Sequence, residues 1–201
     1  NEAVADLFKL EKEAGYPFQH IHATGSYGWE WMPQRVRNFG IDPSEKKGIA
    51  IQEYIYNMPT VMAAADVIIG RAGSATCNEI AAAGTPCVLI PSPNVTNNHQ
   101  EKNARVLEEG GGAVVVLEKD CSPEIMYELI NSLLADEARR EEMSRKLHTM
   151  VHLNSTDRIC DIVEELIRET LLISAIGYCD TKAGYAFVDA QGNVLDVRSG
   201  L

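Results

Sequence analysis

Residues 65–86 read ADVIIGRAGSATCNEIAAAGTP. The apolar run Val67–Gly70 is typical of a strand that is buried on both faces, and Ser74–Ala83 has the composition of a helix. Gly73 separates the two with a tight turn, and Gly84 ends the helix. A buried strand, a turn and a helix in this order predict one unit of a parallel α/β sheet.

The same alternation extends outward in both directions along the chain. Further strands are expected at 18–23, 48–52, 87–91 and 113–117, and further helices at 2–14, 29–38, 60–65, 100–109, 123–135, 137–150 and about 157–170. Ser122 is expected to cap the helix that starts at Pro123. Continuous apolar strands separated by helices predict a Rossmann-like parallel sheet with helices on both faces.

The last part of the chain has a different character. Tyr185–Asp189 and Asn193–Val197 have strand-like composition and flank Ala190-Gln191-Gly192, which predicts a β-hairpin. We therefore expect one α/β domain over residues 1–169 and an unassigned tail over residues 170–201 that contains this hairpin.

The charge balance excludes several classes of function. The chain has 18 Lys and Arg against 29 Asp and Glu, which gives a net charge of −11. This balance argues against nucleic acid as a partner and against electrostatic docking of the chain on anionic lipid. No stretch approaches the roughly 20 apolar residues of a membrane span, and no signal peptide is visible.

The cysteines and histidines do not predict a metal site. The five cysteines are odd in number, widely spaced and free of any C-x-x-C pair, so a reducing cytoplasm is the expected compartment. His148 and His152 are four apart on a predicted helix, a spacing that can hold a metal, but no third ligand follows, and a surface position is favoured. His20 and His22 are interpreted as structural. We expect neither a metal nor a cofactor.

The ligand should bind where the parallel strands end, because sites in such sheets lie at the carboxyl edge. The loops at that edge are 23–28, 53–58, 71–76 and 91–100. The helix that begins at Ser74 has unpaired amides that attract phosphate, and Ser74 and Thr76 add hydroxyl groups. Glu79 is placed to bind the two hydroxyls of a ribose. The alternative is an ordinary capped helix with Glu79 in solvent.

Two motifs resemble one family. They are the run from Arg71 to Pro91 and the later NNHQEKNA at 97–104. They resemble the MurG family, the N-acetylglucosaminyltransferases that convert lipid I to lipid II in peptidoglycan synthesis. The resemblance runs from residue 1 to about 169. It implies the C-terminal half of a GT-B glycosyltransferase, the half that binds UDP-N-acetylglucosamine.

The resemblance implies a role for each matching residue. Glu79 would bind the donor ribose, and Arg71 would shape the uracil pocket. The diphosphate would be lined by Gly73, Ser74, Ala75 and Thr76. Tyr54 and Ile55 would pack on uracil, and His99 and Gln100 would contact the sugar. Asn103 follows in the same motif as a further residue of the donor site. His99 departs from the family's Gln-Gln pattern, so Gln100 is the firmer sugar contact.

Each of these residues also has a plainer interpretation. Tyr54 and Ile55 fit a protein core, and Asn97 and Asn98 fit turn positions before a helix. Arg71 fits a salt bridge, while His99 and Gln100 fit exposed positions in the first turn of a helix.

The resemblance further implies that parts of the family's architecture are absent. Family members open this domain with an apolar strand and a Gly-Gly-Ser-x-Gly-Ala-type loop, and Asn1 follows just after that point. The acceptor domain, which would contact lipid I and the membrane, is also absent. The chain alone is therefore expected to be inactive and its sheet to contain a gap, with the hairpin packed outside the core or at a sheet edge.

The leading hypothesis is thus a hexosyltransferase of peptidoglycan and cell-wall synthesis, a process linked to cell shape and cell division. Full-length members are peripheral proteins on the inner face of the bacterial plasma membrane. One alternative is a stand-alone nucleotide-sugar-binding subunit of a split glycosyltransferase. Another is a protein like UDP-N-acetylglucosamine 2-epimerase, which would need catalytic acidic and histidine residues beyond those seen. The NNHQE run favours the transferase.

Overall fold

The structure is a computed structural model that describes residues 1–42, 48–151, 154–170, 175–178, 185–188 and 194–198. From residue 167 onward only the backbone is described. The chain divides into two compact units, Asn1–Val151 and His152–Leu201. The expected domain boundary at residue 169 stays a prediction.

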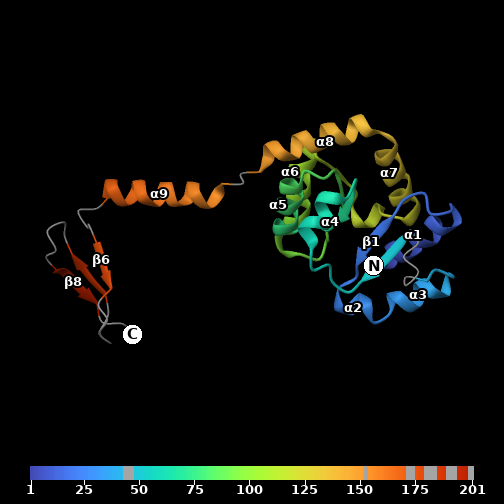
Figure 1. Ribbon diagram of the computed structural model, residues 1–201, viewed down its shortest axis with the longest axis horizontal. Coiled ribbons are helices and arrows are strands. Elements are labelled where there is room, and N and C mark those ends of the chain that lie inside the picture. The colour runs from blue at the N-terminus through green and yellow to red at the C-terminus, as the bar shows by residue number, and fades with distance from the viewer. Residues whose placement is uncertain (43–47, 152–153, 171–174, 179–184, 189–193, 199–201) are drawn as a thin grey trace. The chain divides into compact units, whose positions relative to one another are not determined.

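The first unit alternates strands and helices (Figure 1). Its strands are β1 (His20–Ala23), β2 (Ile49–Gln52), β3 (Ile68–Gly70), β4 (Cys87–Leu89) and β5 (Ala113–Val115). Its helices are α1 (Glu2–Glu13), α2 (Gly25–Trp29), α3 (Met32–Asn38), α4 (Met58–Ala64), α5 (Ser74–Ala83), α6 (His99–Glu109), α7 (Pro123–Ala135) and α8 (Glu137–Met150), with short 3-10 turns η2 (Thr96–Asn98) and η3 (Glu118–Asp120).

The strands of this unit pair in parallel, as the sequence predicts. β1 pairs with β2, and β3, β4 and β5 form a second sheet in that order. In the described part of the chain β1 and β3 are each paired on one side only. The parallel strands therefore form two separate sheets within one compact unit.

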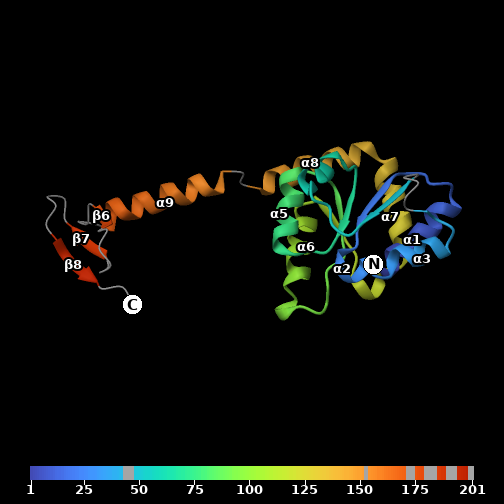
Figure 2. The ribbon, with the colours of Figure 1, turned by 60° about the horizontal axis from the view of Figure 1, so that its bottom comes forward.

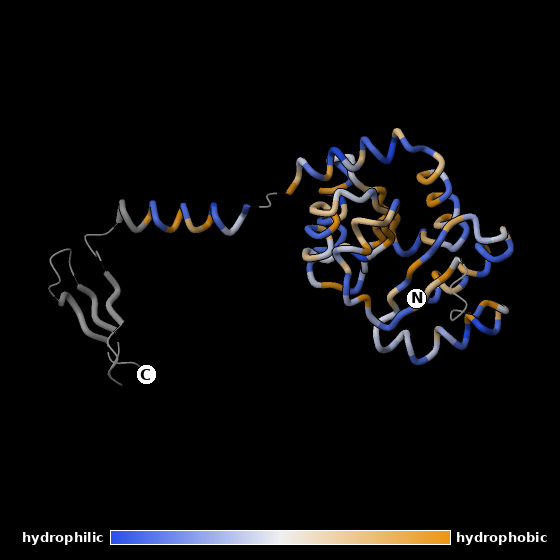
Figure 3. The backbone as a smooth tube through the Cα atoms, viewed as in Figure 1, coloured by the Kyte–Doolittle hydropathy of each residue, from blue (hydrophilic) through white to orange (hydrophobic). Residues whose placement is uncertain are grey.

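Helices cover both faces of the three-stranded sheet, with α5 and α6 on one side and α7 on the other (Figures 1 and 2). Alternate residues of β4 show why. Cys87 and Leu89 pack in one buried cluster with Ile80 of α5 and Leu107 of α6. Val88 packs with Leu133 of α7. All three β4 side chains are buried, as expected of an apolar strand in a parallel sheet. Figure 3 shows hydrophobic residues in the interior of this unit.

The predicted helix ends are confirmed at two positions. The Ser122 hydroxyl accepts a hydrogen bond from the backbone N–H of Ile125, 3.2 Å away, and so caps α7. Gly84 ends α5 with a φ of 68°, a left-handed conformation that glycine adopts without a steric penalty.

One local prediction is wrong. The helix expected over 29–38 is not continuous: α2 ends at Trp29 and α3 begins at Met32, because Pro33 lies in the first turn of α3 and lacks the N–H that a continuous helix would need. Gly73 lies between β3 and α5, as predicted, and is the N-cap residue of α5. Its φ of −64° and ψ of 150° are extended values open to any residue.

The second unit contains the helix α9 (Ser155–Thr170) and the strands β6 (Ala175–Tyr178), β7 (Tyr185–Val188) and β8 (Val194–Arg198). The three strands form an antiparallel sheet of their own, in the order β6-β7-β8. The predicted hairpin is therefore confirmed as β7 and β8. The sequence analysis missed β6, whose four residues include Gly177 and give only a short apolar signal.

Within the described ranges, no helix combines the length and the apolar character that crossing a bilayer requires. Among the same residues, no three His, Cys, Asp or Glu side chains gather where they could hold a metal ion. His152, one of the two histidines with metal-like spacing, lies outside the described residues.

Candidate functional site

The N-terminus of α5 presents open backbone amides at the carboxyl end of β3. Gly73 is the N-cap residue and offers no side chain, and the first intrahelical bond runs from the N–H of Cys77 to the carbonyl of Gly73. The amides of Ser74, Ala75 and Thr76 consequently have no partner within the helix. Among the described residues, a Cβ at Gly73 would meet only the Thr76 hydroxyl oxygen, at 3.7 Å. The start of α5 is therefore accessible to an anion.

Glu79 is the sixth residue of α5, about one and a half turns from the start of the helix. It is exposed, and its carboxylate makes no ion pair or hydrogen bond with the described residues. Thr76 and Glu79 are three residues apart on α5 and so share a face of the helix. The arrangement brings a hydroxyl and a free carboxylate to the same side of the open helix terminus.

Arg71 connects the ends of three parallel strands. It follows β3 directly, forms an ion pair with Glu118 beyond β5, and donates from Nη1 to the carbonyl of Ile90 beyond β4, 3.1 Å away. The salt-bridge interpretation of Arg71 is thus observed. Its side chain is still 53% exposed. Arg71 therefore stays accessible at the carboxyl edge of the sheet despite these two contacts.

Two carboxamides at the start of α6 contact the neighbouring loops. Gln100 Oε1 accepts from the backbone N–H of Ser92 at 2.9 Å, and Asn103 Nδ2 donates to the carbonyl of Ala72 at 3.1 Å. The N–H of Ser92 can only donate, so it must face the oxygen of Gln100, and the carbonyl of Ala72 can only accept, so it must face the NH₂ group of Asn103. Gln100 keeps its NH₂ group for another partner, and Asn103 keeps its oxygen.

The remaining predicted residues lie on the adjoining loops. Tyr54 is 50% exposed, so the core interpretation of this residue is wrong, and Ile55 is half-buried. His99 is exposed in the first turn of α6, with Nδ1 2.9 Å from the carbonyl oxygen of Thr96. Asn97 and Asn98 have φ values of 54° and 52°, which confirms their interpretation as turn formers.

Sequence reasoning missed the partners that hold this edge together. Glu118 and Ser92 carry no motif signal, because each acts through a neighbour distant in sequence. Thr24 was also missed. It is buried, and next to it the N–H of Gly25 donates to the carbonyl of Glu53 at 3.0 Å, which joins the loops after β1 and β2. The one sequence signal for Thr24, Ser92 and Glu118 is that each follows directly after a predicted strand.

The histidines of β1 have structural roles, as predicted. His20 Nδ1 lies 2.9 Å from an oxygen of the fully buried Glu11, and both His20 and His22 pack edge-on against Phe8. Burial, followed by the charges of His20 and the chain's amino terminus, lowers the pKa of His22 to about 3. His22 is therefore neutral at pH 7.

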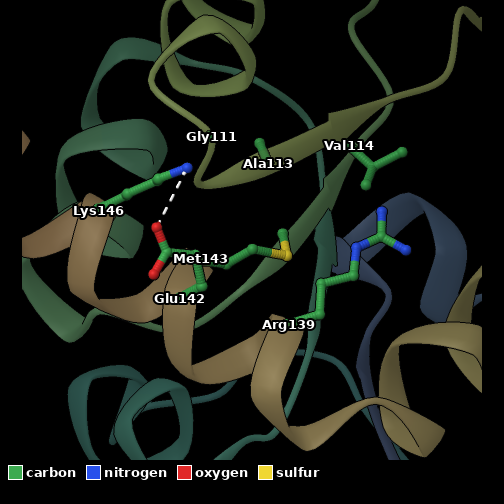
Figure 4. A pocket seen from close by; sticks show the side chains of 7 residues that line it. All are labelled: Gly111, Ala113, Val114, Arg139, Glu142, Met143 and Lys146. Carbon is green, nitrogen blue, oxygen red and sulfur yellow. Dashed lines mark ion pairs between the residues drawn. The ribbon is translucent and has the colours of Figure 1, made fainter.

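A shallow pocket lies elsewhere in the first unit, between the start of β5 and α8 (Figure 4). Arg139, Met143 and Lys146 line it from α8, and Lys146 pairs with Glu142 at 3.3 Å. It contains none of the residues at the carboxyl edge, and we assign it no role in the candidate site.

Comparison with known proteins identifies the family of the domain that carries this candidate site. Residues 1–159 match the sequence model of the glycosyltransferase family 28 C-terminal domain. The chain belongs to this family. The predicted resemblance to MurG proteins and the predicted Rossmann-like half of a GT-B transferase are both confirmed.

Curated relatives of this family 28 chain carry the name UDP-N-acetylglucosamine–N-acetylmuramyl-(pentapeptide) pyrophosphoryl-undecaprenol N-acetylglucosamine transferase. The relative from Acetivibrio thermocellus is 39% identical over 168 residues, which cover 84% of this chain and 44% of that protein. The relative from Caldanaerobacter subterraneus is 38% identical over 168 residues, or 83% of this chain and 44% of that protein. The chain thus spans less than half the length of these relatives.

Solved structures agree with this assignment. MurG of Acinetobacter baumannii superposes with a TM-score of 0.60 at 27% identity, covering 72% of this chain and 40% of that one. The calicheamicin glycosyltransferase CalG4 superposes with a TM-score of 0.59 at 23% identity, covering 83% and 40%, and supports the fold alone.

Proposed function

We propose that this chain is the donor-binding half of an inverting N-acetylglucosaminyltransferase that makes lipid II. The observation that carries the proposal is the open N-terminus of α5 with the free carboxylate of Glu79 beside it, at the carboxyl end of β3 in a family 28 domain. A nucleoside diphosphate offers the two groups that suit this arrangement, a diphosphate for the amides and a ribose diol for Glu79.

The same terminus suits the chemistry of hexosyl transfer. In that reaction the bond between the anomeric carbon and the diphosphate oxygen of the donor breaks as the acceptor hydroxyl attacks from the opposite face. Negative charge develops on the departing UDP, and the acceptor loses a proton to a base. The α5 amides and helix dipole would stabilise that charge, an effect of about 0.3–2 kcal/mol for a single helix terminus. We assign no base within this chain.

The donor subsites follow from the placement of the loops. Tyr54 and Ile55 would contact uracil, and Arg71 would set the shape of that pocket through its bonds to Ile90 and Glu118. The free NH₂ group of Gln100 would reach a sugar hydroxyl, with His99 beside it.

The wider biology is inferred from the relatives. Their printed name gives undecaprenol-linked N-acetylmuramyl-pentapeptide as the acceptor. By this analogy the complete protein would act in peptidoglycan synthesis, in support of cell shape and division. It would lie in the cytoplasm, peripheral to the inner face of the membrane. Contact with the acceptor lipid and the membrane would come from a domain other than this one.

Nucleotide selectivity tests the proposal. UDP, ADP and 2′-deoxy-UDP are titrated into the 201-residue chain by calorimetry, at ligand concentrations up to millimolar because a donor half alone is expected to bind weakly. UDP should bind more tightly than ADP. Equal affinity for the two, or no binding of either, would contradict a uracil pocket.

The role of Glu79 is tested in the same titration. Glu79→Ala should weaken UDP binding roughly 10- to 100-fold, the effect of losing a hydrogen bond to a charged group worth about 1.5–3 kcal/mol. The variant should also lose the preference for UDP over 2′-deoxy-UDP. Glu109→Ala removes an exposed carboxylate at the far end of α6 and is the matched control. A Glu79 variant that retains the ribose preference would show that this carboxylate does not bind the diol.

A further inference from the structure

Asn103 forms a hydrogen bond that links α6 to the loop between β3 and α5. Its Nδ2 donates to the carbonyl of Ala72, a residue 31 positions earlier, and Ala72 is completely buried. Ala72 immediately precedes Gly73, the N-cap residue of α5. A buried carbonyl without a partner would cost about 1–3 kcal/mol, so this bond favours one orientation of the peptide.

The orientation of that carbonyl determines the orientation of the next amide. The described residues contain no cis peptide bond, so the carbonyl of Ala72 and the N–H of Gly73 point in opposite directions across one rigid plane. Holding the carbonyl toward α6 therefore holds the Gly73 N–H away from α6. The carbonyl of Gly73 in turn accepts the first intrahelical bond of α5, from Cys77 at 2.9 Å.

The start of α5 has no side-chain cap among the described residues. Gly73, its N-cap residue, has no side chain, and no described side chain caps the helix through a hydrogen bond. In α7 and α8, by comparison, Ser122 and Asp136 supply side-chain caps. A helix terminus without a cap loses typically about 1 kcal/mol of stability and frays.

We propose that Asn103 is a positioning residue for the open amides of α5. Its carboxamide fixes the Ala72–Gly73 peptide from the side opposite the anion and so replaces the missing cap. It does this instead of contacting the donor directly, the role that the family resemblance implies for it. The use of these amides for a diphosphate rests on the proposed function, whereas the positioning itself does not.

The experiment combines hydrogen exchange of the ligand-free chain with UDP titration. Asn103→Ala and the isosteric Asn103→Asp both remove the donor to Ala72. Each should speed exchange of the Cys77 amide on the order of tenfold, because its acceptor is Gly73. The Val88 amide in the centre of the sheet should be unchanged. UDP affinity should fall about five- to tenfold.

The matched control is Asn131→Ala. Asn131 also donates from its carboxamide to a backbone carbonyl, that of Tyr127 at 2.9 Å, but on α7 and away from α5. It should leave Cys77 exchange and UDP affinity unaltered.

Each alternative result has a distinct meaning. A fall in UDP affinity without faster Cys77 exchange would show direct contact with the ligand and overturn the positioning role. Unchanged exchange and unchanged affinity would overturn it as well. If the wild-type chain binds no UDP, the proposed function fails, while faster Cys77 exchange in both variants still supports positioning. If Asn103→Ala does not fold, Asn103→Asp decides.

Discussion

At the scale of single residues, Gln100 is oriented by the backbone. The backbone N–H of Ser92 donates to the side-chain oxygen of Gln100 at 2.9 Å, so the NH₂ group of Gln100 remains available for a sugar hydroxyl. Gln100→Ala should leave UDP affinity within about twofold. It should lower the affinity for UDP-N-acetylglucosamine about five- to tenfold, the effect of one hydrogen bond of about 1 kcal/mol. Calorimetry with both ligands and with UDP-N-acetylgalactosamine checks this. A loss of UDP affinity equal to that in Glu79→Ala would place Gln100 at the nucleotide instead.

His22 makes the stability of the first unit depend on pH. Its pKa is about 3 in the folded chain, chiefly because of burial, against about 6.5 when unfolded. Between these values the unfolded state binds a proton that the folded state does not, so stability falls as the pH drops below 6.5. The greatest possible loss between pH 6.5 and pH 5.5 is about 1.4 kcal/mol, and partial exposure of the ring reduces it to about 1 kcal/mol.

Urea unfolding at pH 7.5 and pH 5.5 measures this dependence. His22→Gln should lose about 1 kcal/mol less than the wild type over the same interval. His99→Gln, which changes an exposed histidine in the first turn of α6, should behave like the wild type. An identical pH dependence in the wild type and His22→Gln would rule out His22 as the source.

At the scale of elements, the junction between α5 and α8 depends on Gly84. Its φ is 68°, and a Cβ there would lie 2.2 Å from Nε2 of His148 on α8. Gly84→Ala should destabilise the chain by about 1–2 kcal/mol for the left-handed backbone, plus whatever it costs to displace the His148 ring. Thermal or urea unfolding gives the total.

Gly15 allows the two contributions to be separated. It has a similar φ of 79°, but a Cβ there would meet none of the described residues within 4 Å. Gly15→Ala therefore measures the backbone cost alone. The additional cost in Gly84→Ala should disappear in the double variant with His148→Ala. If the two glycine variants are equally destabilised, the His148 ring moves aside freely and the packing contributes nothing.

At the scale of the whole first unit, the parallel strands form two sheets, and in the described part of the chain β3 is paired on one side only. The N–H of Ile68 donates to the carbonyl of Pro86 next to β4. Successive N–H groups of a strand point to opposite sides, so that of Ile69 points away from β4. Ile69 should therefore exchange its amide hydrogen faster than Ile68 and than Val88, which lies between two strands. Residue-resolved hydrogen exchange tests this. Equal protection of Ile68 and Ile69 would show that the other side of β3 has a partner.

The fold followed from the sequence wherever the signal is local. Ser122 and Pro123 mark a helix start through the chemistry of one turn, and Gly84 marks a helix end through its φ. The βα order of residues 65–91 gave the parallel sheet, and with it the edge at which the site residues lie. Local rules failed at Trp29–Asn38, where the cost of a proline outweighed a helical pattern, and at the short strand β6.

The sequence by itself thus determined the family and the alternation of parallel strands and helices in the first unit. Only the tertiary structure decided what the residues at the carboxyl edge contact. Arg71 is bound to Ile90 and Glu118, Gln100 to Ser92, and Asn103 to Ala72. The Asn103 bond joins residues 31 apart and the Arg71–Ile90 bond residues 19 apart. Such pairs meet only after the strands have aligned, because side-chain hydrogen bonds act over about 3 Å and carry no signal along the chain.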